Sequence, residues 1–317
     1  MRIVFMGTPE FAVPVMDKLC AAPGVEVVAV YTPPDRPKGR GRGVESSAVK
    51  AAASALGLPV MQPNSFRSGG ALDDLAKFQP QVIVVAAYGK LLPAGVLNLP
   101  AHGCLNIHPS LLPRYRGPSP VVGAILDGVL TTGVSLMLLD EGMDTGPIIA
   151  QRERVLDGSE TSGDLTGQLF EAGADLLVET LDPWVSGQIK AVQQDASGAT
   201  FTSKLGRNDG RADWQLAAVE LERRRRAFTP WPGLYTQWQD KTVRLLEVVA
   251  FEPPLDFLGY VKEEPGLVQG LAVEDCPLGV GTARGILGLK TLQLEGRRAT
   301  SAAEFLRGYP KFLGSRL

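Results

Sequence analysis

The sequence predicts an α/β protein: a doubly wound, mostly parallel, Rossmann-like sheet domain followed by a smaller C-terminal β-barrel of the OB-like type. In the first half of the chain, short and continuously apolar runs alternate with stretches of helical spacing. Such runs are typical of strands that are buried on both faces of a parallel sheet. After a helix expected around "AAVELERRRRAF", short β-like runs separated by turn residues follow "TPWPG" (229–233) and are typical of a small barrel. The length of 317 residues fits two domains.

The elements of the first domain follow from these runs. "RIVFMG" at the start is a buried strand, and we expect Thr8 to cap the helix that follows, with Pro9 at its first position. Further helices are expected at 48–56 and at about 162–181. The remaining strands are expected at 25–32, 81–89, 103–108, 132–140 and 146–156.

The domain boundaries follow from a change in composition and periodicity near residue 188. The first domain is expected to span 1–188. A polar, glycine-bearing and weakly periodic stretch then indicates a linker at 189–208. The remaining residues, 209–317, are expected to form the β-barrel domain.

Composition excludes several classes of protein. The net charge is −2, so any site for a polyanion depends on local clustering. Three dispersed cysteines and two histidines predict neither a disulfide framework nor a His/Cys metal site. The N-terminus lacks the apolar core of a signal peptide, and no run is long enough to span a membrane, so a cytoplasmic protein is expected.

The glycine pattern argues against nucleotide chemistry. The first strand is followed by "GTPEF" rather than by G-x-G-x-x-G, which disfavours a dinucleotide cofactor. The sequence holds neither a P-loop nor a G-x-S-x-G elbow. Four polar loops nevertheless follow predicted strands, namely "GTPEF", the loop after Thr32, "AYGKLLP" and "NIHPSLLP". Ligands of open α/β sheets bind at the carboxyl ends of strands, so we expect the site there.

Asn106 and His108 are the candidates for chemistry. They are two apart on a predicted strand and therefore project from the same face. An asparagine amide can hold a developing oxyanion, and a histidine can manage one proton near neutral pH. A carboxylate is needed to orient the histidine, and the residue chemistry does not choose between Asp140 and Asp144. Each residue taken alone is more often structural, so only the combination favours catalysis.

Long motifs resemble the folate-dependent formyltransferase family. They are "NIHPSLLPRYRG", "DEGMDTG" and "AYGKLLP", together with the N-terminal "IVFMGTPEFAVPVMDKL", the loop "PDRPKGRG", and the later "RAFTPWPGLYT" and "LQLEGRRATSAAEFLRG". The resemblance covers essentially the whole chain. The N-terminal stretch, the loop and the two later motifs narrow it to the branch that formylates charged initiator tRNA.

The resemblance implies a reaction and a set of site residues. The donor is 10-formyltetrahydrofolate, and the acceptor is the α-amino group of methionine on initiator methionyl-tRNA. Asn106, His108 and Asp144 are implied to be catalytic, with Asn106 and a protonated His108 stabilising the oxyanion. No metal and no nucleotide cofactor are expected. The residues implied to bind the folate are Ser110, Leu111, Leu112 and Pro113, with Ala87, Tyr88, Gly89, Asp140 and Gly142 around the pterin.

A basic loop and the second domain favour tRNA as the acceptor. Arg36, Lys38, Arg40 and Arg42 share one glycine-rich loop, which suits a phosphate backbone. A small acceptor gives little reason for a further domain. Glu45 dilutes the charge of the loop, and Gly123 stands where relatives commonly have a larger residue. A monomer is expected, since nothing in the sequence demands an oligomer.

Three alternatives remain open at this stage. An enzyme that formylates an amino-sugar nucleotide would lack a use for the basic loop. A non-catalytic RNA-binding protein would not need Asn106, His108 and Asp144 together. A formyltetrahydrofolate hydrolase would leave both the loop and the second domain unexplained.

Overall fold

The chain forms two compact units. In this computed structural model, the described residues are 1–317 except 39–42, 68–69, 255 and 260. The first unit contains residues 1–120, 130–156 and 165–203, and the second contains 121–129, 157–164 and 204–317. Within the described part of the chain, no helix is both long enough and apolar enough to cross a membrane.

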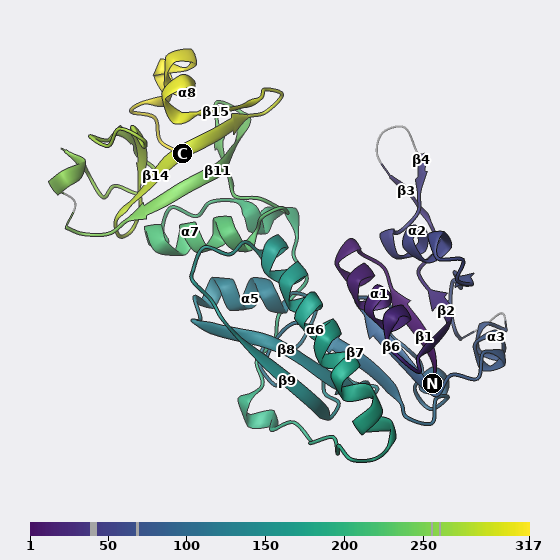
Figure 1. Cartoon of the computed structure of the whole chain (residues 1–317). Helices are drawn as coiled ribbons and strands as arrows, with labels where there is room; N and C mark the ends of the chain where they lie inside the picture. The colour runs from purple at the N-terminus through teal and green to yellow at the C-terminus, as the bar shows by residue number, and fades with distance from the viewer. Residues whose placement is uncertain (39–42, 68–69, 255, 260) are drawn as a thin grey trace. The chain divides into compact units, whose positions relative to one another are not determined.

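A seven-stranded sheet forms the centre of the first unit (Figure 1). Its strand order is β5-β2-β1-β6-β7-β8-β9. The four pairs on the β5 side are parallel, and the two pairs that involve β8 are antiparallel. The strands are β1 (Arg2–Gly7), β2 (Glu26–Tyr31), β5 (Val60–Met61), β6 (Val82–Ala86), β7 (Cys104–His108), β8 (Thr131–Leu138) and β9 (Ile148–Val155).

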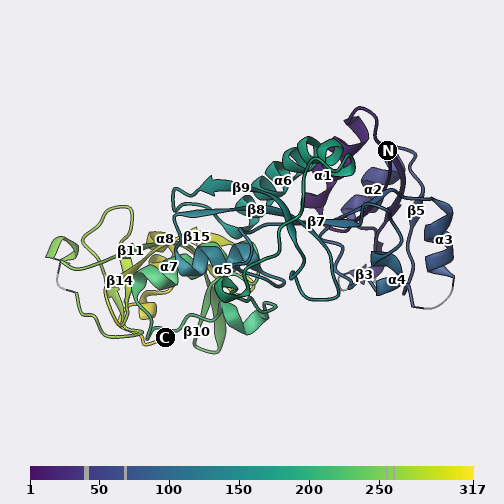
Figure 2. The same ribbon diagram turned by 90° about the horizontal axis from the view of Figure 1, so that it is seen from below.

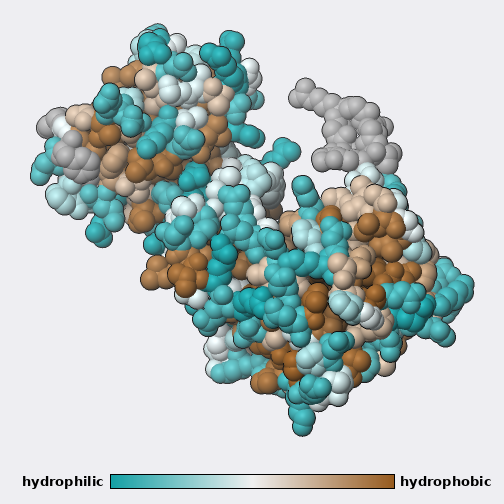
Figure 3. Space-filling model, in the orientation of Figure 1, coloured by the Kyte–Doolittle hydropathy of each residue, from teal (hydrophilic) through white to brown (hydrophobic). Residues whose placement is uncertain are grey.

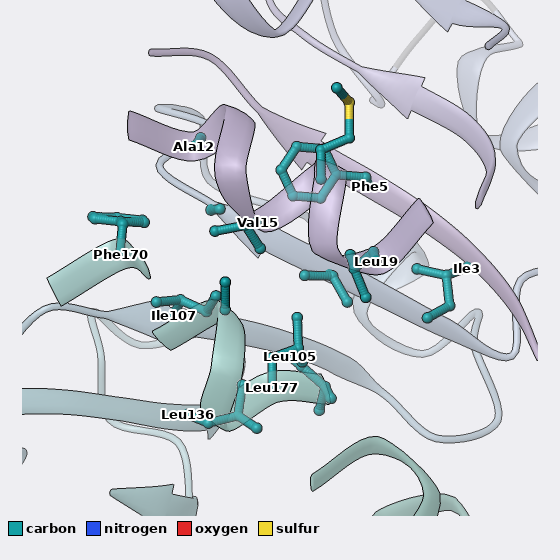
Figure 4. Packing of buried hydrophobic residues seen from close by; sticks show 14 of the residues in the cluster. Ile3, Phe5, Ala12, Val15, Leu19, Leu105, Ile107, Leu136, Phe170 and Leu177 are labelled. Atoms are coloured by element: carbon teal, nitrogen blue, oxygen red, sulfur yellow. The ribbon is translucent and has the colours of Figure 1, made fainter. Parts of the chain in front are cut away.

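Helices cover both faces of this sheet, as the turned view in Figure 2 shows. One core joins the sheet to α1 (Val13–Ala21), α2 (Ala48–Ala55) and α6 (Ser162–Val185). In Figure 4, residues of α1 and α6 meet Leu105, Ile107 and Leu136 of the sheet. The other core joins the opposite face to α3 (Ala71–Lys77) and α4 (Ala94–Leu97). The visible surface over α6 is largely hydrophilic, as its outward side requires (Figure 3).

The first turn after β1 differs from the prediction. A short 3₁₀ helix (Glu10–Ala12) precedes α1, which has Ala12 at its N-cap and no side-chain cap. Thr8 does not cap a helix. Its hydroxyl instead donates to the carbonyl oxygen of Tyr88, 2.9 Å away. The Thr8 hydroxyl, which the local pattern predicts as a helix cap, is therefore used in a tertiary contact instead.

The second unit is built on an antiparallel sheet of six strands, with β15 paired to β14 beside the order β10-β11-β14-β13-β12. Trp238 packs with Phe305 and Phe312 in its core, whereas Trp231 is 51% exposed. The predicted fold class is confirmed. The elements are β10 (Tyr235–Trp238), β11 (Lys241–Phe251), β12 (Val268–Gly270), β13 (Leu278–Gly281), β14 (Ile286–Leu294), β15 (Ala299–Ser301), α5 (Pro120–Asp127), α7 (Ala218–Ala227) and α8 (Ala302–Gly308).

Gly173 lets α6 lie close to the strand β7. A Cβ at this position would come 2.6 Å from Ile107 Cγ2 and 3.0 Å from Val134 Cγ2, which are stiff β-branched side chains. We predict that Gly173→Ala lowers the free energy of unfolding by about 1–3 kcal/mol, the usual cost of overpacking.

Gly167→Ala is the matched control, because Gly167 lies in the same helix and a Cβ there would meet nothing within 4 Å. It is expected to stabilise the chain by about 0.4–1 kcal/mol through the unfolded state. Urea denaturation followed by circular dichroism measures both. Equal effects of the two substitutions would contradict the close packing at Gly173.

Candidate active site

Strand β7 brings Asn106 and His108 to one face of the sheet. Leu105 and Ile107 belong to the core beneath α1 and α6, so the alternating residues Asn106 and His108 face the opposite way. Asn106 pairs with Val85 of β6, in a buried part of the sheet. Among the described residues, none hydrogen-bonds the side-chain amide of Asn106, which is only partly buried. The amide is therefore available to a substrate.

His108 is held in one tautomer by its neighbours. Its side chain is buried, and Nε2 lies 3.0 Å from the carbonyl oxygen of Tyr115. Because a carbonyl oxygen only accepts, Nε2 carries the proton. In the neutral ring, Nδ1 is then the bare nitrogen, and it lies 3.7 Å from Asp144 Oδ1. That separation is too long for a direct hydrogen bond.

Burial governs the charge of His108. Desolvation lowers the pKa of His108 below its ordinary value, while the Asp144 carboxylate and the Tyr115 carbonyl act in the opposite direction and are outweighed. His108 is therefore neutral in the resting site at pH 7. This differs from the protonated imidazole expected from the sequence, and the reason is that the ring is almost wholly withdrawn from water.

Asp144 faces His108 through an unusual backbone conformation. Its φ is +54°, in the left-handed region that non-glycine residues rarely adopt. Its Oδ2 accepts a hydrogen bond from the main-chain nitrogen of Gly117 at 2.7 Å. Asp140 is exposed, and its carboxylate instead accepts from Gly142 N and from the hydroxyl of Thr145 in its own turn. Of the two aspartates left open by residue chemistry, the structure brings Asp144 to His108.

The segment Ser110 to Pro113 is fastened from several sides. The Ser110 hydroxyl donates to the carbonyl of Arg114 at 2.7 Å, so this side chain shapes the loop. The Ser135 hydroxyl donates to Ser110 O and accepts from Leu112 N. Gln151 donates to Leu112 O at 2.9 Å. Leu111 packs against Gly133, where a Cβ would lie 2.6 Å from it.

The segment Ala87–Gly89, which the sequence predicts to lie around the pterin, exposes its main chain rather than its side chains. Tyr88 is buried, with its ring in the core beneath α3 and α4, so only its peptide groups can line a site. Ala87 and Gly89 have φ values of +50° and +78°. A Cβ at Gly89 would meet nothing within 4 Å, so the backbone there is open to a ligand.

Residues 190–202, which the sequence assigned to the linker 189–208, contribute to the site. Residues 165–203 belong to the first unit, so most of the predicted linker is part of it. Thr200 accepts from Tyr115 N and from Arg116 N, and Thr202 N donates to Arg116 O. Gln194 contacts both Arg116 and the turn at Asp144. No local pattern marks these residues, because their partners lie about 50 to 85 positions away.

The basic loop contains a two-stranded hairpin of β3 (Arg36–Lys38) and β4 (Gly43–Glu45), with Arg36 opposite Glu45 in the register. Arg40 and Arg42 lie outside the described residues. The start of the hairpin is anchored by Asp35, whose carboxylate accepts from Lys50 Nζ at 2.5 Å and from Gln62 Nε2 at 2.8 Å. These bonds lower the pKa of Asp35.

Known proteins match the chain along its length. Residues 1–181 match the family described as Formyl transferase, and residues 204–310 match Formyl transferase, C-terminal domain. A methionyl-tRNA formyltransferase of Roseiflexus sp. (strain RS-1) is 47% identical over 317 residues, which are 100% of this chain and 95% of that protein. The chain belongs to the methionyl-tRNA formyltransferase family.

Other members and solved structures agree. The methionyl-tRNA formyltransferase of Chloroflexus aggregans (strain MD-66 / DSM 9485) is 46% identical over 97% of this chain and 97% of its own length. The crystal structure of WlaRD, a sugar 3N-formyl transferase, matches 94% of this chain and 99% of its own, with a TM-score of 0.66 at 16% identity. That likeness shows the shared fold.

In this member of the methionyl-tRNA formyltransferase family, the geometry supplies a partly exposed amide donor and a neutral imidazole that can accept a proton at Nδ1. A carboxylate next to that nitrogen stabilises the imidazolium once it forms. An amide donor, an imidazole that accepts a proton and a neighbouring carboxylate are the groups that general acid–base catalysis at a carbonyl carbon requires.

We predict that His108 titrates below its ordinary pKa of about 6.5. The chain has two histidines, so a His102→Gln variant leaves His108 as the single imidazole for an NMR titration. Adding Asp144→Asn should lower the titration midpoint further, because the carboxylate that raises this pKa is lost. A midpoint at or above 6.5, or a rise with Asp144→Asn, would overturn this electrostatic description.

Proposed function

We propose that this chain transfers the formyl group of 10-formyltetrahydrofolate to the α-amino group of methionine on initiator methionyl-tRNA, for translation initiation. One observation carries the proposal. β7 presents Asn106 and His108 on one face, and Asp144 faces His108, in a chain that methionyl-tRNA formyltransferases match from end to end.

The residues suit attack by a neutral amine. As the amine nitrogen bonds to the formyl carbon, it loses a proton, and Nδ1 of His108 accepts that proton directly or through one water. The imidazolium donates from Nε2 to Tyr115 O and from Nδ1 towards Asp144. The formyl oxygen gains charge, and the Asn106 amide donates to it. When the bond from the formyl carbon to the folate nitrogen breaks, His108 returns the proton to that nitrogen.

The residues present fit a folate. A pterin offers an amide-like edge, which peptide groups recognise well. The open main chain at Gly89 provides such groups. We propose that main-chain groups of Ala87 and of the turn from Asp140 to Gly142 contact the pterin as well. The braced segment Ser110–Pro113 adds an apolar side chain at Leu111, which is half-buried. Because these main-chain groups are already ordered, little conformational entropy is lost when the ligand binds.

The acceptor is held, we infer, by two parts of the chain. The hairpin with Arg36 and Lys38 contacts the phosphate backbone, as do Arg40 and Arg42. The domain at 209–317 contacts the tRNA as well, and it is joined to the catalytic domain (1–188) through residues 189–208. We propose that the enzyme works as a cytoplasmic monomer.

The function is tested by transfer of labelled formyl from 10-formyltetrahydrofolate. Methionyl initiator tRNA, methionyl elongator tRNA and no tRNA are compared. Formylation of the initiator alone is expected. Asn106→Ala should lower kcat by about 10²–10³, the usual cost of losing one oxyanion donor. Near-normal turnover of that variant would remove Asn106 from its role.

Other products of the same assay would redirect the proposal. Formate released without tRNA would indicate a hydrolase. Folate binding without either product would indicate an amino-sugar acceptor or a binding protein. Formylation of elongator and initiator tRNA alike would contradict the assigned acceptor.

The salt dependence of tRNA binding tests the hairpin. Each cation that neutralises a phosphate contributes about 0.9 to the slope of log K against log salt. Arg36→Ala and Lys38→Ala are each expected to reduce that slope by about one unit and to leave folate binding unchanged. Lys77→Ala, on an exposed part of α3, is the control with the same change in charge. An unchanged slope in the hairpin variants would contradict their phosphate contacts.

A further inference from the structure

We propose that Gln194 is a positioning residue of the active site, whose side-chain amide fixes the bend that carries the Asp144 carboxylate to His108. This inference rests on the proposed function and adds to it a residue that none of the motifs contains. The Nε2 of Gln194 donates to the carbonyl oxygens of Asp144 at 2.8 Å and of Gly146 at 2.7 Å. It therefore holds the main chain on both sides of Thr145.

The orientation of the Gln194 amide is determined by chemistry. Its Oε1 accepts from Nε of Arg116 at 3.1 Å and from Nη2 at 2.8 Å. A guanidinium only donates and a carbonyl oxygen only accepts, so the amide oxygen must face Arg116 and the amide nitrogen must face the turn. All four contacts are satisfied in this one orientation.

Arg116 fixes the amide from its other side. Its side chain is 5% exposed, and among the described residues it makes no ion pair. Its guanidinium lies over the ring of Phe201, 6.0 Å from the ring centroid. The buried Arg116 guanidinium donates to the neutral amide oxygen of Gln194, and hydrogen bonds from a charged donor are stronger than those between neutral groups. Arg116 thus holds the Gln194 amide on the side that faces away from the turn.

The turn needs such support. Asp144 has a φ of +54°, a conformation that costs of order 1–3 kcal/mol and persists only when its surroundings determine it. The carboxylate is bonded to Gly117 N, but that contact lies at the end of a rotatable side chain. The bonds from Gln194 act on the backbone itself, and they set where the side chain starts.

Gln194→Leu keeps a side chain of similar size but removes both the bonds to Arg116 and the bonds to the turn carbonyls. Gln194→Glu separates these two sets of bonds, because a carboxylate still accepts from Arg116 but places an acceptor against two carbonyl oxygens. Gln193→Leu is the matched control, since Gln193 is the exposed neighbour and no hydrogen bond of its side chain is present among the described residues. Thermal denaturation of each variant establishes that it is folded.

We expect both Gln194 variants to lose about 10–100-fold in kcat, the usual cost of removing a residue that holds a catalytic group in place. The KM values for both substrates should change little. In the His102→Gln background, the NMR titration of His108 should move to lower pH in the Gln194→Leu variant, because Asp144 is the charged group that acts on this ring and the Tyr115 carbonyl on its other nitrogen remains. Gln193→Leu should leave all three quantities unchanged.

Two results would overturn the proposal. One is a folded Gln194→Leu variant with unchanged kcat and an unchanged His108 titration. The other is a loss confined to the KM for 10-formyltetrahydrofolate, which would assign Gln194 to substrate binding instead. The titration needs no tRNA and no turnover, so it still tests Gln194 if the wild-type chain fails to formylate initiator tRNA.

Discussion

The site depends on the bend that runs from Asp144 to Gly146. This bend turns the chain back after β8 and places one carboxylate beside a buried imidazole 36 positions earlier. It is determined from three directions. Gly117 N binds the carboxylate, Gln194 binds the carbonyls on either side, and Gly146 passes so close to Leu138 that a Cβ would lie 1.9 Å from its carbonyl oxygen. Strained backbone at a functional site is maintained by such redundancy.

Burial and charge then act together. A histidine withdrawn from water resists protonation, which keeps it able to accept a proton at neutral pH. The carboxylate at 3.7 Å is near enough to stabilise the imidazolium but too far to bond the ring directly. In the proposed reaction, the imidazolium charge therefore exists only while His108 holds the proton of the amine. Preorganised electrostatics of this kind usually make the largest contribution to catalysis.

Much of this was accessible from the sequence, and for a physical reason. The strand β7 alternates between the core residues Leu105 and Ile107 and the proposed catalytic residues Asn106 and His108, so a period of two is enough to place both of these side chains on one face. The uninterrupted apolar runs likewise identified the parallel part of the sheet.

Other features of the site depend on tertiary contacts, which no local sequence pattern indicates. Thr8 carries the pattern of a helix cap, yet Tyr88, 80 positions away, takes its hydroxyl. Asp140 and Asp144 are equivalent in sequence chemistry, and only the left-handed bend distinguishes them. Gln194 lies in a polar stretch with the composition of a linker, and its role depends on contacts to residues far away in the chain.

We infer that His108 and Asp144 act as one unit, and this coupling can be measured in a double-mutant cycle. The values of kcat/KM for His108→Gln, Asp144→Asn and the double variant are compared with those of the wild type. Strong non-additivity is expected, with the double variant about as impaired as the worse single one. The parallel cycle of His108→Gln with Asp140→Asn should be additive, because among the described residues the Asp140 carboxylate bonds only within its own turn. Losses that multiply in the first cycle would contradict the account.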